Sequence, residues 1–231
     1  AVGHPGCDPY STGVSDHPVQ FLCQHFGDAA KVTLAERIHG QHVHPRRVQV
    51  LRDCFASLLP KSGLVLDVGC GDGLLACLIK EKRPDLDVRG VDVLVRPHTY
   101  MPVEPFDGYR LPSDNASVDV VIFVDVLHHT ADPMILLREA TRVARKAIVI
   151  KDHTLNGILA GPTLRFMDRM GNQRHGVTIP YNYWSREKWI EACNELELKI
   201  SAWLTDLKLY PWPADLIFGR TLHFIARFDL R

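Results

Sequence analysis

The sequence predicts an α/β fold with a Rossmann-like, doubly wound sheet, and three observations support this prediction. Short apolar runs alternate with helical patterns between residues 64 and 150, which is typical of a parallel sheet covered by helices. The first run, 64–68, ends in a glycine-rich loop. The run 118–124 is almost wholly apolar, as expected of a strand that is buried on both faces.

Composition limits the class of protein. The 231 residues are enough for one large domain or a domain with an appendage, and 46% of them are hydrophobic. Lys plus Arg and Asp plus Glu number 27 each, so the formal net charge is zero. This balance argues against a nucleic-acid partner that needs a broad basic surface. No apolar run approaches the ~20 residues of a transmembrane helix, so no membrane span is expected.

The cysteines indicate a reducing compartment, and we expect a cytoplasmic protein. The six cysteines follow no repeated spacing, and no two of them form a C-x-x-C pair, which argues against a disulfide framework and a structural zinc site. They are Cys7, Cys23, Cys54, Cys70, Cys77 and Cys193. The N-terminal residues also lack the basic and then apolar pattern of a secretory signal.

Residues 1–60 are expected to form an N-terminal arm and a helical cap. Residues 1–18 are rich in Gly, Pro, Ser, Asp and His and predict a loose arm. A helical pattern follows and is strongest over 46–59, where apolar residues recur every three or four positions. Pro60 and Gly63 then end the helix.

The core, residues 61–231, continues as alternating helices and strands. The expected elements are a strand over 64–68, a helix over 74–82, strands over 87–93 and 118–124, a helix from Asp132 to about Ala144, and a strand over 147–150. Asp132 and Pro133 are typical of a helix start, a capping residue followed by a first-turn proline. Four prolines lie between residues 94 and 117, so any strand there should be short.

A lid and an antiparallel edge are expected after residue 150. Residues 153–183 contain several glycines and prolines and are expected to be irregular, as part of an insertion over about 153–184. Such an insertion follows the carboxyl end of a strand, where α/β proteins bind ligands, so we expect it to be a lid. A helix capped by Ser185 follows. The runs 198–204 and 221–228 predict an antiparallel strand pair in the same sheet.

The glycine loop indicates a nucleoside ligand without a pyrophosphate. Gly69, Gly71 and Gly73 allow a ligand to approach the backbone closely. Leu74 stands where a dinucleotide fingerprint requires its third glycine. Asp92 ends the next strand, and a carboxylate there can accept hydrogen bonds from both ribose hydroxyls.

The sequence lacks the motifs of several other enzyme classes. No Gly-Lys pair is present for a phosphate-binding P-loop, and no G-x-S-x-G for a hydrolase nucleophile. No tyrosine is followed four residues later by a lysine, the pair common in short-chain dehydrogenases.

Further segments in the right order complete a family pattern. They are Val65–Gly73, Gly90–Asp92, Asp107–Gly108, Leu111–Asp114, Val118–Val121, Val126–His129 and Leu136–Glu139. Over about 90 residues the chain resembles the class I S-adenosylmethionine-dependent methyltransferases, in particular the type-11 group that includes methylases of ubiquinone and menaquinone biosynthesis.

The resemblance implies the cofactor S-adenosylmethionine and a role for ten residues. Gly69, Cys70, Gly71 and Gly73 would surround its methionine part, Asp67 and the Asp125 carbonyl its ammonium group, Asp92 the ribose, and Val93, Asp107 and Gly108 the adenine.

Histidines at the ends of predicted strands are the candidate catalytic bases. His128 and His129 follow one strand and His153 follows the next, with Asp152 beside it. The first pair has an alternative role in packing the loop. Asp125 and Asp152 also resemble the acids that hold magnesium in catechol-type O-methyltransferases. Because His153 stands where the third ligand is usually an amide or an acid, no metal is expected.

The lid residues leave the acceptor open. Aromatic and methionine side chains suit an apolar or aromatic substrate, or they pack the lid onto the sheet. They are Phe166, Met167, Met170, Tyr181, Tyr183 and Trp184. Arg165, Arg169 and Arg174 suit a carboxylate or phosphate, or form a solvated face.

The sequence therefore predicts methyl transfer to a small-molecule acceptor. A catalytically silent S-adenosylmethionine-binding scaffold and a nicotinamide-dependent oxidoreductase are the alternatives.

Overall fold

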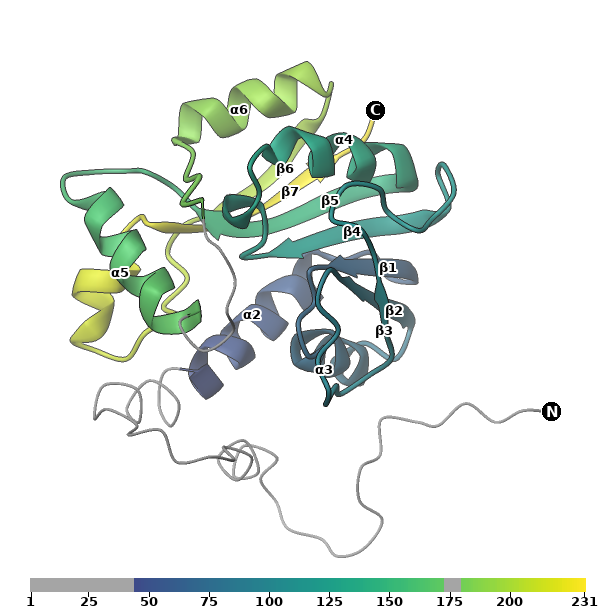
Figure 1. The fold of residues 1–231 in the computed structure, drawn as a ribbon, viewed down its shortest axis with the longest axis horizontal. Helices are drawn as coiled ribbons and strands as arrows, with labels where there is room; N and C mark the ends of the chain where they lie inside the picture. Colours follow the sequence, from purple (N-terminus) through teal and green to yellow (C-terminus); the bar gives the residue numbers. More distant parts are fainter. Residues whose placement is uncertain (1–43, 173–179) are drawn as a thin grey trace, which may run out of the picture.

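A seven-stranded sheet forms the centre of the molecule, with helices on both faces (Figure 1). The computed structural model describes residues 44–172 and 180–231, so the predictions for residues 1–43 and for Arg174 lie outside the described residues. The strand order is β3-β2-β1-β4-β5-β7-β6. The strands are β1 (Gly63–Val68), β2 (Leu86–Asp92), β3 (Val103–Pro105), β4 (Val118–Val124), β5 (Ala144–His153), β6 (Lys199–Leu204) and β7 (His223–Asp229).

The sheet has the predicted mixture of parallel and antiparallel pairing. β1 pairs in parallel with β2 and β4, with Val65 opposite Val88 on one side and Val120 on the other. β7 pairs antiparallel with both β5 and β6. The carboxyl ends of β1, β2, β4 and β5 therefore meet at one edge of the sheet, where ligands bind in open α/β folds.

Apolar helix faces cover the sheet. Leu51 and Phe55 of α2 (His44–Leu58) and Ile79 of α3 (Leu74–Lys82) share one buried cluster with β1 and β4. α4 (Pro133–Val143) and α6 (Arg186–Glu195) belong to a second cluster, through residues such as Leu136 and Trp189. The two clusters hold the helices on the sheet, and the parallel strands between them end at the ligand-binding edge.

Several local predictions are confirmed. Asp132 caps α4 by accepting a hydrogen bond from the Met134 amide at 2.9 Å, and Pro133 occupies the first turn. Ser185 caps α6 through the Lys188 amide at 3.3 Å. The strand expected among the prolines is three residues long. The four cysteines that the structure describes form no disulfide.

The prediction that residues 153–183 are irregular was wrong over α5 (Ala160–Asn172). Gly161 and Pro162 lie in its first turn, where a proline is tolerated because its missing amide would have no partner there. Leu164 and Asp168, one helical turn apart, both face inward. None of the helices that the structure describes is both long and apolar enough to cross a membrane.

Candidate functional site

The glycine loop after β1 has the conformation that its sequence predicts. Gly69, Gly71 and Gly73 all have positive φ, at 73°, 65° and 77°. A Cβ on Gly69 would lie 2.6 Å from a methyl group of Val126, and a Cβ on Gly73 would lie 2.6 Å from the Met101 side chain. Both the backbone conformation and the space therefore require glycine.

Asp92 joins the glycine loop to the end of β2. Its Oδ2 accepts a hydrogen bond from the Gly71 amide at 2.7 Å, and its Oδ1 accepts one from the Leu94 amide at 2.9 Å. A carboxylate has about four lone-pair sites, so each oxygen can still accept a hydrogen bond from a ribose hydroxyl. Asp92 can therefore hold a ribose in the position that the loop defines.

The three residues predicted at the adenine also lie together. A Cβ on Gly108 would lie 3.2 Å from a methyl group of Val93, and the Val93 side chain is exposed. The Asp107 Oδ1 accepts hydrogen bonds from the amides of Arg110 and Tyr109, which lower the pKa of Asp107. These residues follow β2 and β3, next to Asp92.

Asp67 places an unpaired carboxylate oxygen beneath the loop. Its side chain is buried, and among the described residues its Oδ1 has no hydrogen-bond partner. Burial and the neighbouring Asp92 carboxylate raise the pKa of Asp67 to about 7. A buried acceptor without a partner is costly, so Asp67 suits a cationic ligand group.

Cys70 contributes its backbone to this site. A Cβ on Gly90 would lie 2.6 Å from the Cys70 Sγ, so the thiol packs against β2. Burial and the Asp67 carboxylate raise the pKa of the thiol far above its usual range, which keeps it protonated. Together, the glycine cradle, the unpaired Asp67 oxygen and the Asp92 carboxylate fit S-adenosylmethionine.

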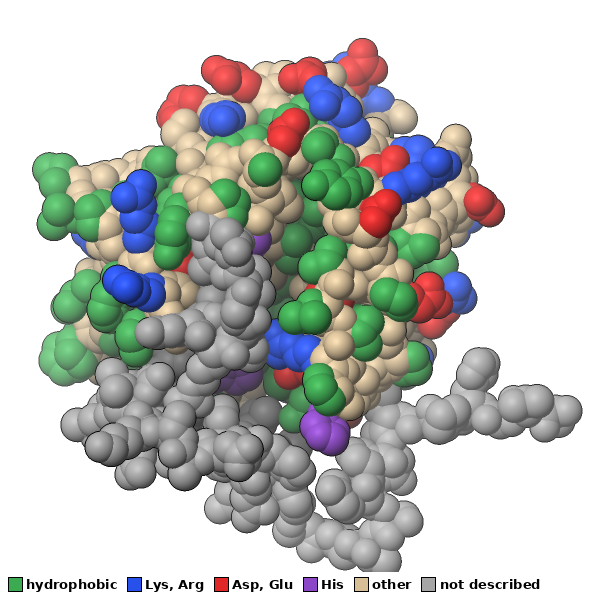
Figure 2. Space-filling model, in the orientation of Figure 1, with side chains coloured by type: hydrophobic (Ala, Val, Ile, Leu, Met, Phe, Trp, Pro, Cys, Tyr) green, Lys and Arg blue, Asp and Glu red, His purple; other side chains and the backbone are tan. Residues whose placement is uncertain are grey.

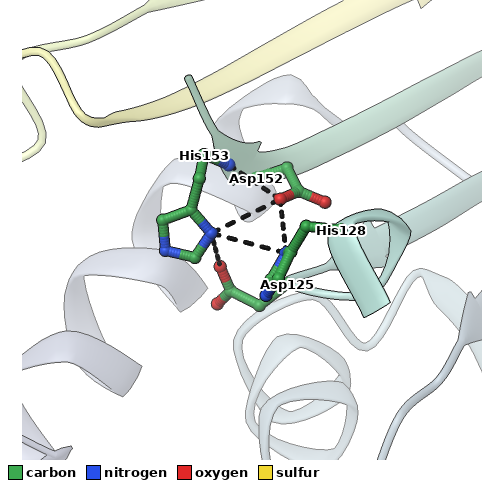
Figure 3. A group of neighbouring side chains, drawn as sticks. All are labelled: Asp125, His128, Asp152 and His153. Carbon is green, nitrogen blue, oxygen red and sulfur yellow. Dashed lines mark hydrogen bonds and ion pairs between the residues drawn. The ribbon is translucent and has the colours of Figure 1, made fainter. Parts of the chain in front are cut away.

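A second group of side chains lies at the ends of β4 and β5 (Figure 3). Asp125 follows β4 and forms ion pairs with Arg47 of α2 and Lys151 of β5. Burial opposes the ionisation of Asp125, but these two cations outweigh it and hold its pKa well below the usual range. Burial also lowers the pKa of Lys151 to about 8, against the attraction of Asp125.

His128 lies between two carboxylates. Its Nδ1 is 2.6 Å from Asp152 Oδ1, and its Nε2 is 3.3 Å from Asp168 Oδ2 of α5. Burial alone would lower the pKa of His128, but Asp152 and Asp168 raise it to about 10. His128 is therefore an imidazolium near pH 7, with both ring nitrogens engaged, and it is poorly suited to accept a proton.

His153 has the opposite electrostatic environment. Its Nδ1 lies 3.4 Å from Asp152 Oδ1 and 3.7 Å from Asp125 Oδ1. Burial, Lys151 and the charged His128 lower its pKa, so the ring is neutral near pH 7. A neutral imidazole beside carboxylates that can stabilise its protonated form is the usual arrangement of a general base.

His129 is neutral as well but lacks an orienting partner. Burial and the charge of His128 lower its pKa to about 4. Its Nδ1 is buried without a hydrogen-bond partner among the described residues, and its ring lies 4.1 Å from that of His128. Of the three predicted histidines, His153 has the surroundings that best suit a base.

Four donor groups of this cluster could hold a metal ion. One ligand atom from each of Asp125, His128, Asp152 and His153 lies within 4.8 Å of the others. However, Asp125 already forms ion pairs with the side chains of Arg47 and Lys151. The charges of Asp125, Asp152 and Asp168 are matched by Arg47, Lys151 and the imidazolium of His128. A proton on His128 thus balances the cluster without a divalent ion.

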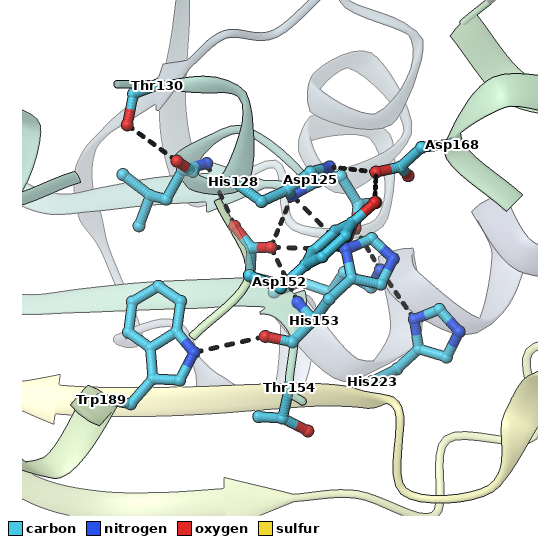
Figure 4. A network of polar contacts seen from close by, with 12 residues as sticks. Asp125, His128, Thr130, Asp152, His153, Thr154, Asp168, Trp189 and His223 are labelled. Carbon is cyan, nitrogen blue, oxygen red and sulfur yellow. Dashed lines mark hydrogen bonds and ion pairs between the residues drawn. The ribbon is translucent and has the colours of Figure 1, made fainter. Parts of the chain in front are cut away.

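Sequence reasoning missed several members of this network (Figure 4). They are Arg47, Lys151, Asp168 and His223. The Lys151 Nζ lies 3.3 Å from the Nδ1 of His223 on β7. A charged residue within an apolar strand pattern, as Lys151 is, could have been detected. Asp168 could not, because the region was expected to be irregular.

The lid residues differ in position. Tyr183 and Trp184 are buried, and the Tyr183 hydroxyl donates a hydrogen bond to Asp168. Phe166, in contrast, is exposed on the outer face of α5, as are Arg165 and Arg169.

Known proteins resemble both the sequence and the fold. A family model described as a methyltransferase domain matches residues 66–149. Over 103 residues the chain is 32% identical to the Mycobacterium tuberculosis protein named "Probable S-adenosylmethionine-dependent methyltransferase Rv3030". That match covers 42% of this chain and 38% of the relative, so well under half of the relative's length is represented.

Solved structures share the fold over most of the chain. A methyltransferase in complex with the Haloferax volcanii activator Trm112 covers 84% of this chain and 93% of its own, with a TM-score of 0.60 and 16% identity. The Burkholderia thailandensis 1,6-didemethyltoxoflavin-N1-methyltransferase, solved with S-adenosylhomocysteine, covers 79% and 77%, with a TM-score of 0.58 and 14% identity. Residues 66–149 therefore carry a methyltransferase domain of the type-11 family, and the chain shares its fold with solved S-adenosylmethionine-dependent methyltransferases.

Proposed function

We propose that this protein transfers a methyl group from S-adenosylmethionine to a small-molecule acceptor bound at the carboxyl ends of β4 and β5. The arrangement of Asp92 carries the proposal, because its carboxylate is hydrogen-bonded to the Gly71 amide and still has free lone pairs. Asp67, beneath the loop, offers a buried oxygen to a cationic group. The glycine loop and the two acids suit a nucleoside that carries an amino-acid chain and no phosphate.

The ten predicted cofactor residues would hold S-adenosylmethionine, which supplies a methyl group on a sulfonium and leaves as a neutral thioether. Val93, Asp107 and Gly108 would bind the adenine, and Asp92 the ribose. The loop residues 69–73 would line the methionine part, with Asp67 and the Asp125 carbonyl at the ammonium group. Because the leaving group is good, the protein's main tasks are to align the acceptor and exclude water.

His153 is the proposed base for an acceptor that must lose a proton. Its neutral ring can accept that proton, and the Asp152 and Asp125 carboxylates stabilise the imidazolium that results. His128 and Asp168 have a positioning role, since they hold Asp152 and α5 in place. His129 lines the same region without a role in proton transfer.

The experiment uses S-adenosylmethionine with an isotopically heavy methyl group and fractionated small-molecule and lipid extracts. Mass spectrometry should find an acceptor whose mass increases by one heavy methyl group, together with an equal amount of S-adenosylhomocysteine. His153→Gln should abolish most of this transfer while S-adenosylhomocysteine still binds, and Glu195→Gln, on the surface of α6, is the matched control.

A catalytically silent scaffold would give a different result. It would bind S-adenosylhomocysteine but transfer no methyl group to any fraction, which would contradict the proposed activity. A nicotinamide-dependent oxidoreductase would instead bind NADH, which is detected by the change in its fluorescence.

A further inference from the structure

Exposed apolar side chains form a rim beside the acceptor site. We define the apolar rim as Leu155, Ile158, Leu159, Phe166, Trp212, Leu216 and Ile217, all of which are exposed. Ile158 is 88% exposed and Trp212 is 81% exposed, so these side chains project from the surface. The rim comes from the loop before α5, from α5 itself, and from the segment around η4 (Asp215–Gly219).

Direct contacts show that the two segments of the rim lie side by side. The rings of Phe166 and Phe218 stack with their centres 6.2 Å apart. The Arg220 guanidinium donates to Thr163 Oγ1 at 3.1 Å, and Asn156 Nδ2 donates to Thr221 Oγ1 at 3.1 Å. Figure 2 shows hydrophobic side chains along the edge formed by α5 and η4, with basic side chains between them. The apolar rim is therefore one continuous surface.

Basic side chains flank the apolar rim. Arg165, Arg169 and Arg220 are exposed. Arg165 lies over the Tyr181 ring, and Arg220 donates hydrogen bonds to the Ile217 carbonyl and to the Thr163 hydroxyl. Because these partners are neutral, they do not cancel the positive charge of the two arginines. The acids of the same segments face inward. Asp168 is buried against His128, and Asp215 accepts a weak hydrogen bond from the Tyr210 amide.

We propose that the apolar rim and its three arginines dock the protein onto the surface of an anionic lipid bilayer. A protruding Ile-Leu pair, an exposed tryptophan and flanking arginines suit the boundary between headgroups and acyl chains, where apolar and basic side chains are both stabilised. A rigid protein partner would require a flat or concave complementary surface, whereas side chains that project this far fit a soft one.

Docking would place the acceptor site next to the bilayer. The outer face of α5 carries Phe166, Arg165 and Arg169. Its inner face carries Asp168, which contacts His128. The same helix thus connects the apolar rim to the acceptor site. The second part of the inference rests on the proposed function: the acceptor is an amphiphile that the enzyme takes from the lipid surface.

Vesicle flotation with the full chain tests the docking. The protein should float with vesicles of equal phosphatidylglycerol and phosphatidylcholine, and less with phosphatidylcholine alone. The double variant Ile158→Asp/Leu159→Asp should bind at least tenfold more weakly. Arg165→Glu/Arg169→Glu should lose the preference for phosphatidylglycerol. Matched controls are Leu204→Asp, an exposed apolar site on β6, and Arg89→Glu, an exposed basic site on β2. Both should bind like the wild type.

Tryptophan emission gives a second measurement at the rim itself. Vesicles should shift the emission to the blue, and Trp212→Phe should remove the shift, because Trp184 and Trp189 are buried and Trp203 lies on β6, stacked on Phe224. Circular dichroism establishes that each variant is folded.

Three results would overturn the docking proposal. In the first, the wild type does not float with vesicles. In the second, the control variants lose as much vesicle binding as the rim variants. In the third, the wild type binds no vesicles but forms a dimer that Ile158→Asp/Leu159→Asp abolishes. Calorimetry with S-adenosylhomocysteine separates this proposal from the proposed function. Intact nucleoside binding without flotation overturns the docking alone, and flotation without nucleoside binding overturns the proposed function alone.

Discussion

Two acids at the glycine loop have different environments, although both end a parallel strand. Asp67 is buried and has a pKa of about 7, whereas Asp92 is half-buried and hydrogen-bonded to two amides. An unpaired carboxylate inside the protein is destabilising when it ionises. Asp67 is therefore the residue at which cofactor binding and stability oppose each other, as is common at functional sites.

Asp67→Asn should stabilise the protein in alkaline buffer and weaken cofactor binding. The folded-state pKa is above the unfolded value of 3.8, so the destabilisation caused by Asp67 grows as the pH rises from about 3.8 and is fully present above about 7. We expect the variant to gain about 1–3 kcal/mol in free energy of unfolding at pH 8 and little at pH 4. Chemical denaturation without ligand measures this difference. An equal gain at both pH values would contradict it.

The pH dependence of methyl transfer should report His153. Its folded-state pKa is lowered from 6.5, so the neutral form that accepts a proton persists below pH 6.5. We expect kcat/KM for the identified acceptor to remain level from pH 8 to pH 6.5 and to fall only at more acidic pH. His153→Gln should lower kcat by about 10²–10⁴-fold and leave binding of S-adenosylhomocysteine unchanged. A fall centred above pH 7 would exclude His153 as the base.

The residues that the sequence revealed are those whose roles depend on near neighbours. The positions of Gly69, Gly73 and Asp92 follow from a strand, a turn and the next strand. This order is visible in a short stretch of sequence. Lys151 and Asp168 depend on contacts between elements far apart in the chain, such as the approach of α5 to His128. No local pattern encodes these contacts. They arise only when the sheet and α5 pack together.

Among the elements, α5 connects the surface to the charge cluster at the ends of β4 and β5. Its inner side chain Asp168 contacts His128 and accepts from the Tyr183 hydroxyl. Leu164 packs in a small apolar cluster of its own. Because that cluster is small, the charged contacts of Asp168 should supply much of the energy that holds α5 in place.

Asp168→Asn should loosen α5. Hydrogen bonds to charged groups contribute about 1.5–3 kcal/mol, so amide hydrogen exchange in α5 should accelerate by about 10–150-fold. Exchange in α4, on the other side of the site, should not change. Glu195→Gln, which affects a surface ion pair with Arg138, is the control. Unchanged protection of α5 in Asp168→Asn would show that apolar packing alone holds the helix.

The α5 sequence explains why a helix was not expected there. Gly161 and Pro162 indicate a turn, yet at the start of a helix they are well tolerated. The inward residues Ala160, Leu164 and Asp168 recur every four positions, but the series includes an acid and only one large apolar residue. The buried face is therefore narrow, and the turn-forming residues at its start conceal the helix in the sequence. By comparison, α4 begins with the cap Asp132 and the first-turn Pro133, and it was predicted.

In the whole molecule, one buried charge network ties four elements together. Arg47 of α2, Asp125 after β4, Asp152 of β5 and Asp168 of α5 meet around His128 and Lys151. Removing one member leaves a buried charge without a partner, which is strongly destabilising. The fold and the proposed acceptor site therefore depend on the same ionisation states.

The effect of His128→Gln on stability should depend on pH. The folded-state pKa of His128 is about 10 and the unfolded value is 6.5, so its charge contributes stability that is fully present below pH 6.5 and is lost as the pH rises through 10. The variant should be strongly destabilised at pH 6 and much less so at pH 10. Comparison with the wild type at each pH removes the effects of other groups, such as Lys151. A constant difference would contradict the imidazolium assignment.

The most direct test of the central claim is calorimetric titration of the full chain with S-adenosylhomocysteine. We expect a single site of about micromolar affinity. Asp92→Ala should weaken binding by about 5–150-fold, equivalent to 1–3 kcal/mol of lost hydrogen bonds, while Asp87→Ala on the exposed side of the same strand should bind like the wild type. Absence of binding by the wild type, or wild-type affinity in Asp92→Ala, would contradict the account.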